Sequence, residues 1–239
     1  AIRCVPLAPS SPLASCENES VETRSLQAKG ICFGYSGKQV LRDFNLTIEP
    51  GERVALRAPS GTGKTTLCCI LAGYLQPASG TVLADGPRSG ASPVQLVAQH
   101  PERMMDPAIP IRRSLAEATT EPEDAQALAS WEEKGDGIEG GSMVPRLLES
   151  LGVQRAWLER FPSELSGGEL QRCCIARALI ARPRYLICDE ISTMLDAATQ
   201  AYLWRFLIDH AQANGIGMVL VTHSDALLDH IATRIVELP

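Results

Sequence analysis

A short loop rich in glycine and threonine, set between an apolar strand and an apolar helix, constrains this chain more than any other feature. Residues 58–66 read Ala-Pro-Ser-Gly-Thr-Gly-Lys-Thr-Thr and follow the apolar run Val54-Ala55-Leu56. Glycine lets a main chain turn tightly enough for its N–H groups to face phosphate oxygens, and a helix start adds partial positive charge there. The loop therefore predicts a site for a nucleoside triphosphate.

The residue types within this loop predict individual roles. Lys64 is expected to reach the outer phosphates, and Thr65 to bind Mg²⁺ through its hydroxyl. The strict pattern begins with glycine where this chain has Ala58, which is disfavoured if the backbone there needs a positive φ. The residues expected to contact the nucleotide are Ser60, Gly61, Thr62, Gly63, Lys64, Thr65 and Thr66.

A second apolar strand, Tyr185-Leu186-Ile187-Cys188, ends in two carboxylates, Asp189 and Glu190. Ligands bind at the carboxyl ends of parallel strands. Asp189 is therefore expected to hold Mg²⁺, and Glu190 to orient or deprotonate an attacking water. Taken alone, the pair is equally compatible with solvated acids at a strand end.

Strand-like and helix-like segments alternate along much of the chain, which predicts a mostly parallel sheet covered on both faces. The acidic stretch from Glu117 to Glu139 is expected to be a solvated face or a mobile loop. Residues 1–24 are expected to form a flexible tail. Strands are expected at 31–35, 40–48, 52–56, 82–83, 94–98, 185–188, 216–221 and 234–238. Helices are expected at 64–75, 111–119, 143–151, 168–181, 196–213 and from 224.

Composition excludes some classes of function. The chain has 28 acidic and 22 basic residues, a formal net charge of −6, so a nucleic-acid partner is not expected. No apolar run approaches the ~20 residues that cross a bilayer. Cysteines 68, 69, 173, 174 and 188 lie in apolar segments, which predicts small buried side chains in a reducing compartment.

A third motif gives the chain a family resemblance. Residues 165–172 read Leu-Ser-Gly-Gly-Glu-Leu-Gln-Arg, which resembles the signature sequence of the ATP-binding cassette (ABC) ATPases, with Glu169 where glutamine is commoner. Residues 193–196, Thr-Met-Leu-Asp, are similar to the D-loop of that family. The resemblance covers roughly residues 25–238.

The resemblance implies an α/β fold, the P-loop NTPase cassette of the ABC type. Such a cassette has a mostly parallel sheet core, an N-terminal antiparallel β subdomain and an inserted helical subdomain. Here the cassette would span 25–239, with the helical subdomain at roughly 100–165. The cofactors implied are ATP and Mg²⁺.

Further site residues follow from the same resemblance. Tyr35 fits the aromatic side chain that stacks on adenine, and Gln99 fits the glutamine that borders the helical subdomain and binds nucleotide and metal. The catalytic residues implied are Glu190, His223 and Lys64, where His223 contacts the γ-phosphate. Ser166, Gly167 and Gly168 precede an expected helix and would form a second phosphate-binding helix start, with Glu169 as a further nucleotide-binding residue.

Two such helix starts in one chain cannot easily converge on one triphosphate. The family's arrangement is a head-to-tail dimer, in which loop 58–66 of one subunit faces residues 166–168 of the other. The partner implied is therefore a second ABC subunit, identical or related. The activity implied is ATP hydrolysis that powers transport through separate membrane permeases, at the cytoplasmic face of the cell membrane, with a substrate-binding protein as an indirect partner.

The cargo is indicated only by subfamily resemblance. The Glu-Leu-Gln-Arg ending and the sequence Gln99-His100-Pro101 resemble importer ATPases for dipeptides, oligopeptides and nickel. Many of these have a longer C-terminal extension, so an end at Pro239 favours nickel or metallophore import. Met104, Met105 and Ile109 are expected either to contact a permease helix or to belong to the subdomain core.

Two alternatives stay open. One is a soluble ABC ATPase that acts on DNA or ribosomes rather than in transport. The other is a weakly hydrolysing, nucleotide-binding regulatory subunit. Ala58 keeps this second alternative open, as does Ile191, which stands where the family commonly has proline and so leaves the following turn without a fixed φ.

Overall fold

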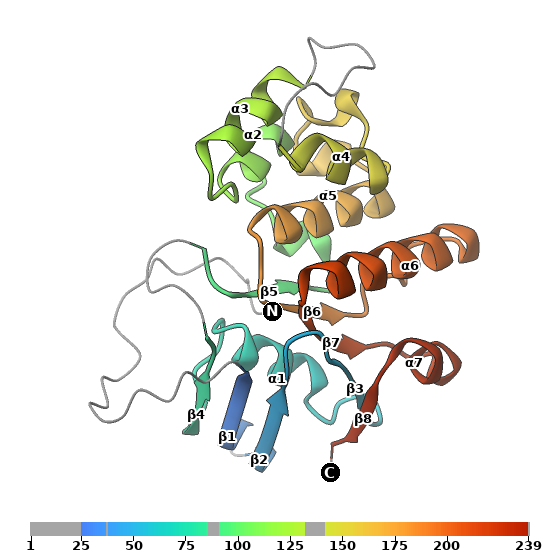
Figure 1. The fold of residues 1–239 in the computed structure, drawn as a ribbon. Coiled ribbons are helices and arrows are strands. Elements are labelled where there is room, and N and C mark those ends of the chain that lie inside the picture. The colour runs from blue at the N-terminus through green and yellow to red at the C-terminus, as the bar shows by residue number, and fades with distance from the viewer. Residues whose placement is uncertain (1–24, 37, 86–90, 132–141, 239) are drawn as a thin grey trace.

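The computed structural model describes residues 25–36, 38–85, 91–131 and 142–238 (Figure 1). A parallel sheet has the strand order β5-β6-β7-β3-β8, and an antiparallel sheet has the order β2-β1-β4. The strands are β1 (Leu26–Tyr35), β2 (Lys38–Ile48), β3 (Arg53–Arg57), β4 (Ser79–Leu83), β5 (Val94–Val97), β6 (Tyr185–Asp189), β7 (Gly217–Val221) and β8 (Arg234–Glu237). The α-helices are α1 (Lys64–Leu71), α2 (Ile111–Ala116), α3 (Pro122–Ser130), α4 (Val144–Ser150), α5 (Gly167–Ile180), α6 (Ala197–Asn214) and α7 (Asp225–Ile231).

Alternating side chains divide the two faces of the parallel sheet between two hydrophobic clusters. Along β3, Val54 and Leu56 pack with α1 and the antiparallel sheet, whereas Ala55 packs in the cluster that holds α5, α6 and α7. Figure 1 shows the same layers, with α1 and β1–β2–β4 on one side of the sheet and α6 and α7 on the other. The predicted parallel sheet covered on both faces is confirmed.

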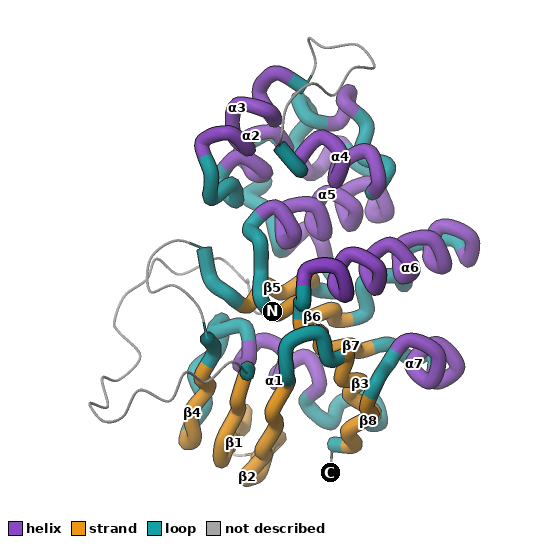
Figure 2. The backbone as a smooth tube through the Cα atoms, in the orientation of Figure 1, coloured by secondary structure: helices purple, strands orange, loops and turns teal. Residues whose placement is uncertain are grey.

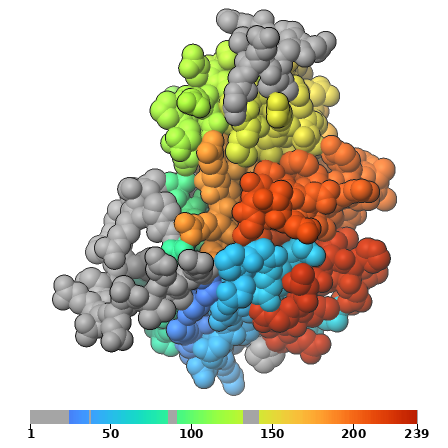
Figure 3. All heavy atoms as spheres, viewed as in Figure 1, coloured from blue at the N-terminus to red at the C-terminus, as the bar shows by residue number. Residues whose placement is uncertain are grey.

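Helices α2, α3 and α4 pack together at the upper end of the molecule, beyond α5 (Figure 3). They fall within the stretch expected to form the inserted helical subdomain. Met105 is buried in the hydrophobic cluster, as expected if it belongs to the subdomain core rather than to a permease contact. Met104 and Ile109 are half-buried. The other expected boundary, the flexible tail at 1–24, lies outside the described residues.

Residues 122–130 of the acidic stretch form α3. The expected solvated face is found at Glu117, Glu121 and Glu123, which are exposed, and Asp124 is the exception. Leu128 is buried, and Asp124 is only 1% exposed although it lies in the acidic run. Its Oδ2 atom accepts a hydrogen bond from Nη2 of Arg182 at 2.8 Å, and its Oδ1 atom accepts one from the Ser142 hydroxyl at 3.0 Å. A distant arginine therefore allows a carboxylate to be buried in a segment whose composition indicates solvent. Residues 132–139 of the run lie outside the described part of the chain.

The five cysteines expected to be buried are all buried and free of disulfide bonds. Burial raises the pKa of the Cys173 thiol to about 12, and it raises the pKa values of Cys68, Cys174 and Cys188 as well. These thiols are protonated at neutral pH and behave as small apolar side chains.

Candidate nucleotide site

The phosphate loop connects β3 to α1, as the sequence predicts. Gly61 and Gly63 have φ values of 82° and 100°, a left-handed backbone that other L residues rarely adopt. A Cβ atom on Gly63 would lie 2.4 Å from Cγ1 of Val40, so this glycine also allows the loop to lie directly against β2. Figure 2 shows the loop in teal between strand and helix.

The start of α1 is open to an anion. Its N-cap residue is Gly63, and no side chain caps the helix, so the first backbone N–H groups have no side-chain acceptor. Lys64 is 8% exposed, and its Nζ atom donates to the carbonyl oxygens of Ala58 at 2.6 Å and Pro59 at 2.9 Å. The ammonium group is thus held within the loop by neutral acceptors, which a phosphate anion can replace with stronger, charge-assisted contacts.

Ala58 does not strain the loop. Among the described residues, the non-glycine positions with positive φ are Ser36, Asp43, Arg182 and Glu190, and Ala58 is not one of them. Its side chain packs against the cluster that contains α1 and the antiparallel sheet. The backbone at this position therefore makes no demand that only glycine meets.

Asp189 and Glu190 lie at the carboxyl end of β6, next to the phosphate loop. Burial raises the pKa of Asp189; a hydrogen bond from Thr65 and the positive charge of Lys64 act in the opposite direction, while the Glu190 carboxylate adds to the rise. Asp189 is 2% exposed. Its Oδ1 atom and the Oε2 atom of Glu190 are both buried without a hydrogen-bond partner in the described structure.

Glu190 has a left-handed backbone, with φ of 54°, and its N–H donates to the carbonyl oxygen of Val221 at 2.9 Å. The second residue after Val221 is His223, whose Nε2 atom lies 2.7 Å from Oε1 of Glu190. Ile191, which stands where the family commonly has proline, is buried in the core. Burial of Ile191, together with the Glu190–Val221 hydrogen bond, fixes this turn without a proline ring.

Two predicted site residues lie on other edges of the site. Tyr35 ends β1, is 40% exposed, and its hydroxyl lies 3.4 Å from Oγ1 of Thr66. Its ring meets that of Phe33 edge-on, with centroids 4.9 Å apart, so a ring face is available for stacking. Gln99 follows β5 and is half-buried.

The predicted second helix start has a capping box at the beginning of α5. The Ser166 hydroxyl accepts from the Glu169 N–H at 3.4 Å, and Glu169 Oε2 accepts from the Ser166 N–H at 2.8 Å. The hydrogen bond from the Ser166 backbone N–H to the carboxylate, followed by an interaction with the Ser166 side chain, lowers the pKa of Glu169. The carboxylate thus acts as a reciprocal cap, a role that glutamine, the commoner residue here, can also fill.

The segment that resembles the D-loop packs against this helix start. A Cβ atom on Gly167 would lie 2.7 Å from Sδ of Met194, and one on Gly168 would lie 3.1 Å from Cδ2 of Leu195. An open hollow between the two segments is lined by Ser166, Gly167, Gly168, Glu169, Arg172, Met194, Leu195, Asp196 and Thr199.

The structure therefore brings together some predicted residues and separates others. Lys64, Thr65, Asp189, Glu190 and His223 form one connected cluster. No hydrogen bond or ion pair between described residues joins residues 166–169 to loop 58–66. In a single chain, the described site is thus a phosphate loop with its acids and histidine, and a separate helix start.

Comparison with known proteins identifies the family. Residues 41–193 match the family described as ABC transporter. The chain belongs to the ABC transporter family. It is an ATP-binding subunit of that family and an ATPase, as the sequence motifs predict.

Relatives and solved structures agree with this assignment. The chain is 33% identical over 215 residues to the nickel import system ATP-binding protein NikE of Staphylococcus aureus. The aligned region covers 89% of this chain and 86% of the relative. It is similar to the ATP-binding subunit of an ABC transporter, with a TM-score of 0.71, 25% identity, and 90% and 85% of the two chains covered. Its fold also resembles the dimeric post-hydrolysis structure of the ATP-binding cassette MJ0796 bound to ADP and Pi, with a TM-score of 0.69, 23% identity, and 89% and 94% covered.

Proposed function

We propose that this ABC ATPase powers transport through separate integral membrane permeases, by ATP-driven dimerisation with a second ABC subunit at the cytoplasmic face of the membrane. Nickel, a metallophore or a peptide is the proposed cargo class, with a substrate-binding protein as the indirect partner. Among the described helices, none combines the length and the apolar character that a bilayer span requires. The likeness to NikE, named as part of a nickel import system, supports the choice of nickel.

The observation that carries the dimer proposal is the division of the site. The loop at 58–66 has open N–H donors and an ammonium group. At the start of α5 the capping box takes up the Ser166 and Glu169 N–H groups, so Gly167 and Gly168 would supply the second set of donors, and no described contact joins them to the loop. A triphosphate held between the loop of one subunit and residues 166–168 of another would use both sets. Binding of ATP would then hold the two subunits together, and loss of the γ-phosphate would release them.

The acids beside the loop fit a magnesium ion bound together with ATP. Mg²⁺ prefers oxygen ligands, and Asp189 Oδ1 is a buried oxygen without a hydrogen-bond partner next to the Thr65 hydroxyl. Among the described residues, no three His, Cys, Asp or Glu side chains lie close enough together to hold a metal ion by themselves. Phosphate oxygens and water would therefore complete the coordination of the Mg²⁺ ion. We propose Thr65, Gln99 and Asp189 as the residues on this side. The ion would neutralise charge on the terminal phosphates.

The other residues of the cluster divide the work of hydrolysis. Lys64 would leave the carbonyl oxygens of Ala58 and Pro59 for the outer phosphates. Glu190 would accept a proton from the attacking water through its unpartnered Oε2 atom, while Oε1 is held by His223. His223 would contact the γ-phosphate, and Tyr35 would stack on adenine.

A mixing experiment tests the composite site. Lys64→Ala damages the loop side of a site and Ser166→Arg damages the other side, so each variant dimer alone has two damaged sites. When the variants are mixed, a mixed dimer has one intact site and one doubly damaged site, and Mg²⁺-dependent ATP hydrolysis is expected to return. A matched control mixes Lys64→Ala with Glu190→Gln, which both damage the loop side and should restore nothing.

Absence of recovery in the first mixture would contradict a site shared between copies of this chain. The transport role has a separate test, which is to identify the membrane proteins that co-purify with the chain. Permease subunits are the expected result. Co-purification with ribosomes or DNA-bound complexes would instead favour the soluble alternative, and ATP binding without turnover in the complete assembly would favour the regulatory one.

A further inference from the structure

Strand β3 carries two arginines on the face that packs against α7. Arg53, Ala55 and Arg57 alternate with Val54 and Leu56, and Ala55 lies in the same cluster as Leu228 and Ile231 of α7. The small side chain of Ala55 allows α7 to lie close to the strand. Arginines therefore stand at both ends of the stretch of β3 that faces this helix.

These arginines hold α7 at its two ends. Nε of Arg57 lies 2.9 Å from Oδ1 of Asp225, an ion pair without hydrogen-bond geometry, and its Nη2 donates a hydrogen bond to Oδ1 of Asp229 at 2.7 Å. Nε of Arg53 donates to the carbonyl oxygen of Ile231 at 2.7 Å, where the last carbonyls of a helix need donors. Asp225 and Asp229 are four residues apart, so both point from one face of the helix toward Arg57.

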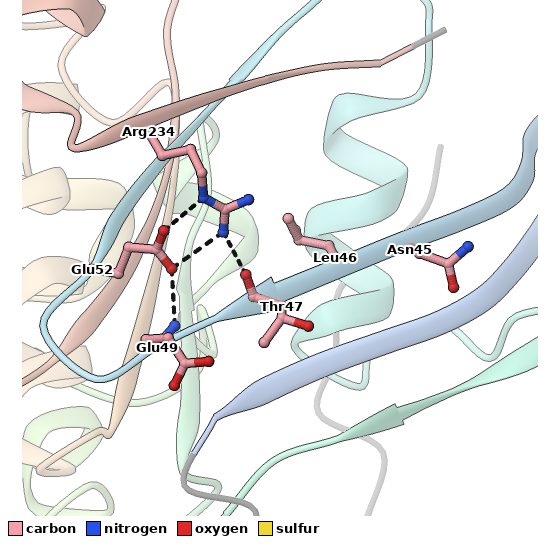
Figure 4. Close-up of a pocket in the computed structure, with 6 residues that line it drawn as sticks. All are labelled: Asn45, Leu46, Thr47, Glu49, Glu52 and Arg234. Atoms are coloured by element: carbon pink, nitrogen blue, oxygen red, sulfur yellow. Dashed lines mark hydrogen bonds and ion pairs between the residues drawn. The ribbon is translucent and has the colours of Figure 1, made fainter.

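The chain just beyond α7 is fixed in the same manner. Arg234 begins β8, and its Nε lies 2.6 Å from Oε1 of Glu52 while its Nη2 donates to the carbonyl oxygen of Thr47 at 2.6 Å (Figure 4). These contacts join the exit of α7 to the turn that precedes β3. Contacts with β3 therefore fix both the start and the end of α7, and contacts with the turn before β3 fix the residues that follow the helix.

Both ends of the Arg57 ion pair adjoin the nucleotide site. Arg57 is followed directly by Ala58, the first residue of the phosphate loop, and Asp225 comes two residues after His223. The start of α7 has further contacts: the Ser224 carbonyl oxygen accepts from the Leu228 N–H at 3.0 Å, and Ser224 makes two longer hydrogen bonds, each 3.3 Å. Among these contacts, the Arg57 ion pair is the one that joins this turn to β3. His223 itself is exposed, so its own packing does little to fix it.

We propose that Arg57 is a positioning residue for His223. By joining the first turn of α7 to the root of the phosphate loop, it holds the imidazole within reach of Glu190 and of the terminal phosphate. This inference rests on the proposed role of His223. The ion pair would keep the phosphate loop and the segment that carries His223 at a fixed separation. That separation matters because small displacements of a reacting group have large effects on rate.

The experiment measures steady-state ATP hydrolysis by the full chain, assayed with the subunits that co-purify with it. Four variants are compared with the unmodified protein. Arg57→Gln is expected to lower kcat by about tenfold and to change the KM for ATP by less than about twofold, because the loop still binds phosphate. Arg57→Lys, which keeps the charge, should restore part of the loss. Asp225→Asn combined with Asp229→Asn should lower kcat as Arg57→Gln does, and adding Arg57→Gln should lower it no further.

A matched control and a reference variant make the result specific. Arg205→Gln removes an exposed ion pair with Asp209 on α6, where the two charges lie 3.9 Å apart, and should leave kcat unchanged. His223→Ala should lower kcat, and adding Arg57→Gln to it should cause little further loss. Thermal melting of every variant shows whether α7 and the sheet remain folded.

The outcomes separate this inference from the proposed function. If His223→Ala lowers kcat but Arg57→Gln and the double aspartate variant leave it unchanged, Arg57 does not position the histidine. A raised KM with unchanged kcat in Arg57→Gln would also overturn the inference, because Arg57 would then act on phosphate binding. If His223→Ala leaves kcat unchanged, the proposed role of His223 fails, and the inference fails with it.

Discussion

The imidazole Nε2 atom of His223 lies 2.7 Å from the Oε1 atom of Glu190. The two residues follow neighbouring parallel strands, β7 and β6, and the Glu190 N–H also donates to the last residue of β7. The pair therefore forms because two strand ends are adjacent, although the residues are far apart in sequence. One carboxylate oxygen is held by the imidazole, whereas Oε2 is buried without a hydrogen-bond partner in the described structure, and it is the oxygen that we propose as the proton acceptor.

This geometry predicts that Glu190→Gln retains ATP binding and loses hydrolysis. The amide keeps the size of the side chain but cannot accept a proton, so kcat should fall about 100-fold or more. Because the nucleotide is not cleaved, a dimer should accumulate in the presence of ATP. Turnover and size-exclusion chromatography with ATP measure both effects, and a monomeric, fully active variant would refute the role of the base and the dimer alike.

Replacement of Lys64 by alanine should weaken ATP binding. The variant loses a charge-assisted contact with phosphate, which corresponds to roughly a 10- to 100-fold rise in Kd. Isothermal titration measures the change. Lys29→Ala, which removes an exposed lysine on β1, is the matched control and should bind ATP as the unmodified protein does. Equal affinity in the two variants would count against the loop assignment.

Asp189→Asn should make the protein more stable at neutral pH and less active. The native pKa of Asp189 is raised by burial, so its ionised form destabilises the fold at pH values above that pKa. Below the ordinary pKa of an aspartate, about 4, the group is protonated in both states and the effect disappears. The melting temperature of the variant should therefore exceed that of the unmodified protein at pH 7, by a margin that shrinks on acidification.

A matched control for this prediction is Asp209→Asn, which alters an exposed carboxylate. It should change the melting temperature little at either pH. A lower melting temperature for Asp189→Asn at pH 7 would mean that the carboxylate stabilises the folded protein.

The Arg182–Asp124 ion pair predicts an asymmetry between its two partners. Arg182→Gln leaves the Asp124 carboxylate buried without its cation, and should lower the free energy of unfolding by about 3–5 kcal/mol. Asp124→Asn leaves an arginine that is half-exposed and can be hydrated, so the loss should be smaller, about 1–2 kcal/mol. Urea unfolding of the two variants tests the order. The reverse order would show that Asp124 is hydrated in solution.

Local sequence was sufficient where structure depends on local chemistry. The phosphate loop, the acidic end of β6 and the helix start at Ser166 all lie in the elements that their motifs indicate. The continuous apolar runs of β3 and β6 also predict the burial that the structure has. These features depend on residues within one strand, turn or helix, so a single sequence contains the information.

Features that depend on distant residues could not be predicted in this way. The burial of Asp124 depends on Arg182, and Glu121 to Ser130 alone resemble a solvated acidic segment. Arg57 gave one local signal, a charge at the end of an apolar strand, but its two aspartate partners lie near the other end of the chain. Such pairs become visible only when the strand order is known.

The contact between Gly63 and Val40 links the nucleotide loop to the antiparallel sheet. Because the missing Cβ of Gly63 leaves the space that a Val40 methyl group occupies, the two positions share one fixed volume. Drift at position 40 toward isoleucine or phenylalanine would press on the loop from behind, so variation among orthologues should be confined there to side chains no larger than valine. Strand β2 has no proposed catalytic group, yet its residue at position 40 would be limited in size by its contact with Gly63.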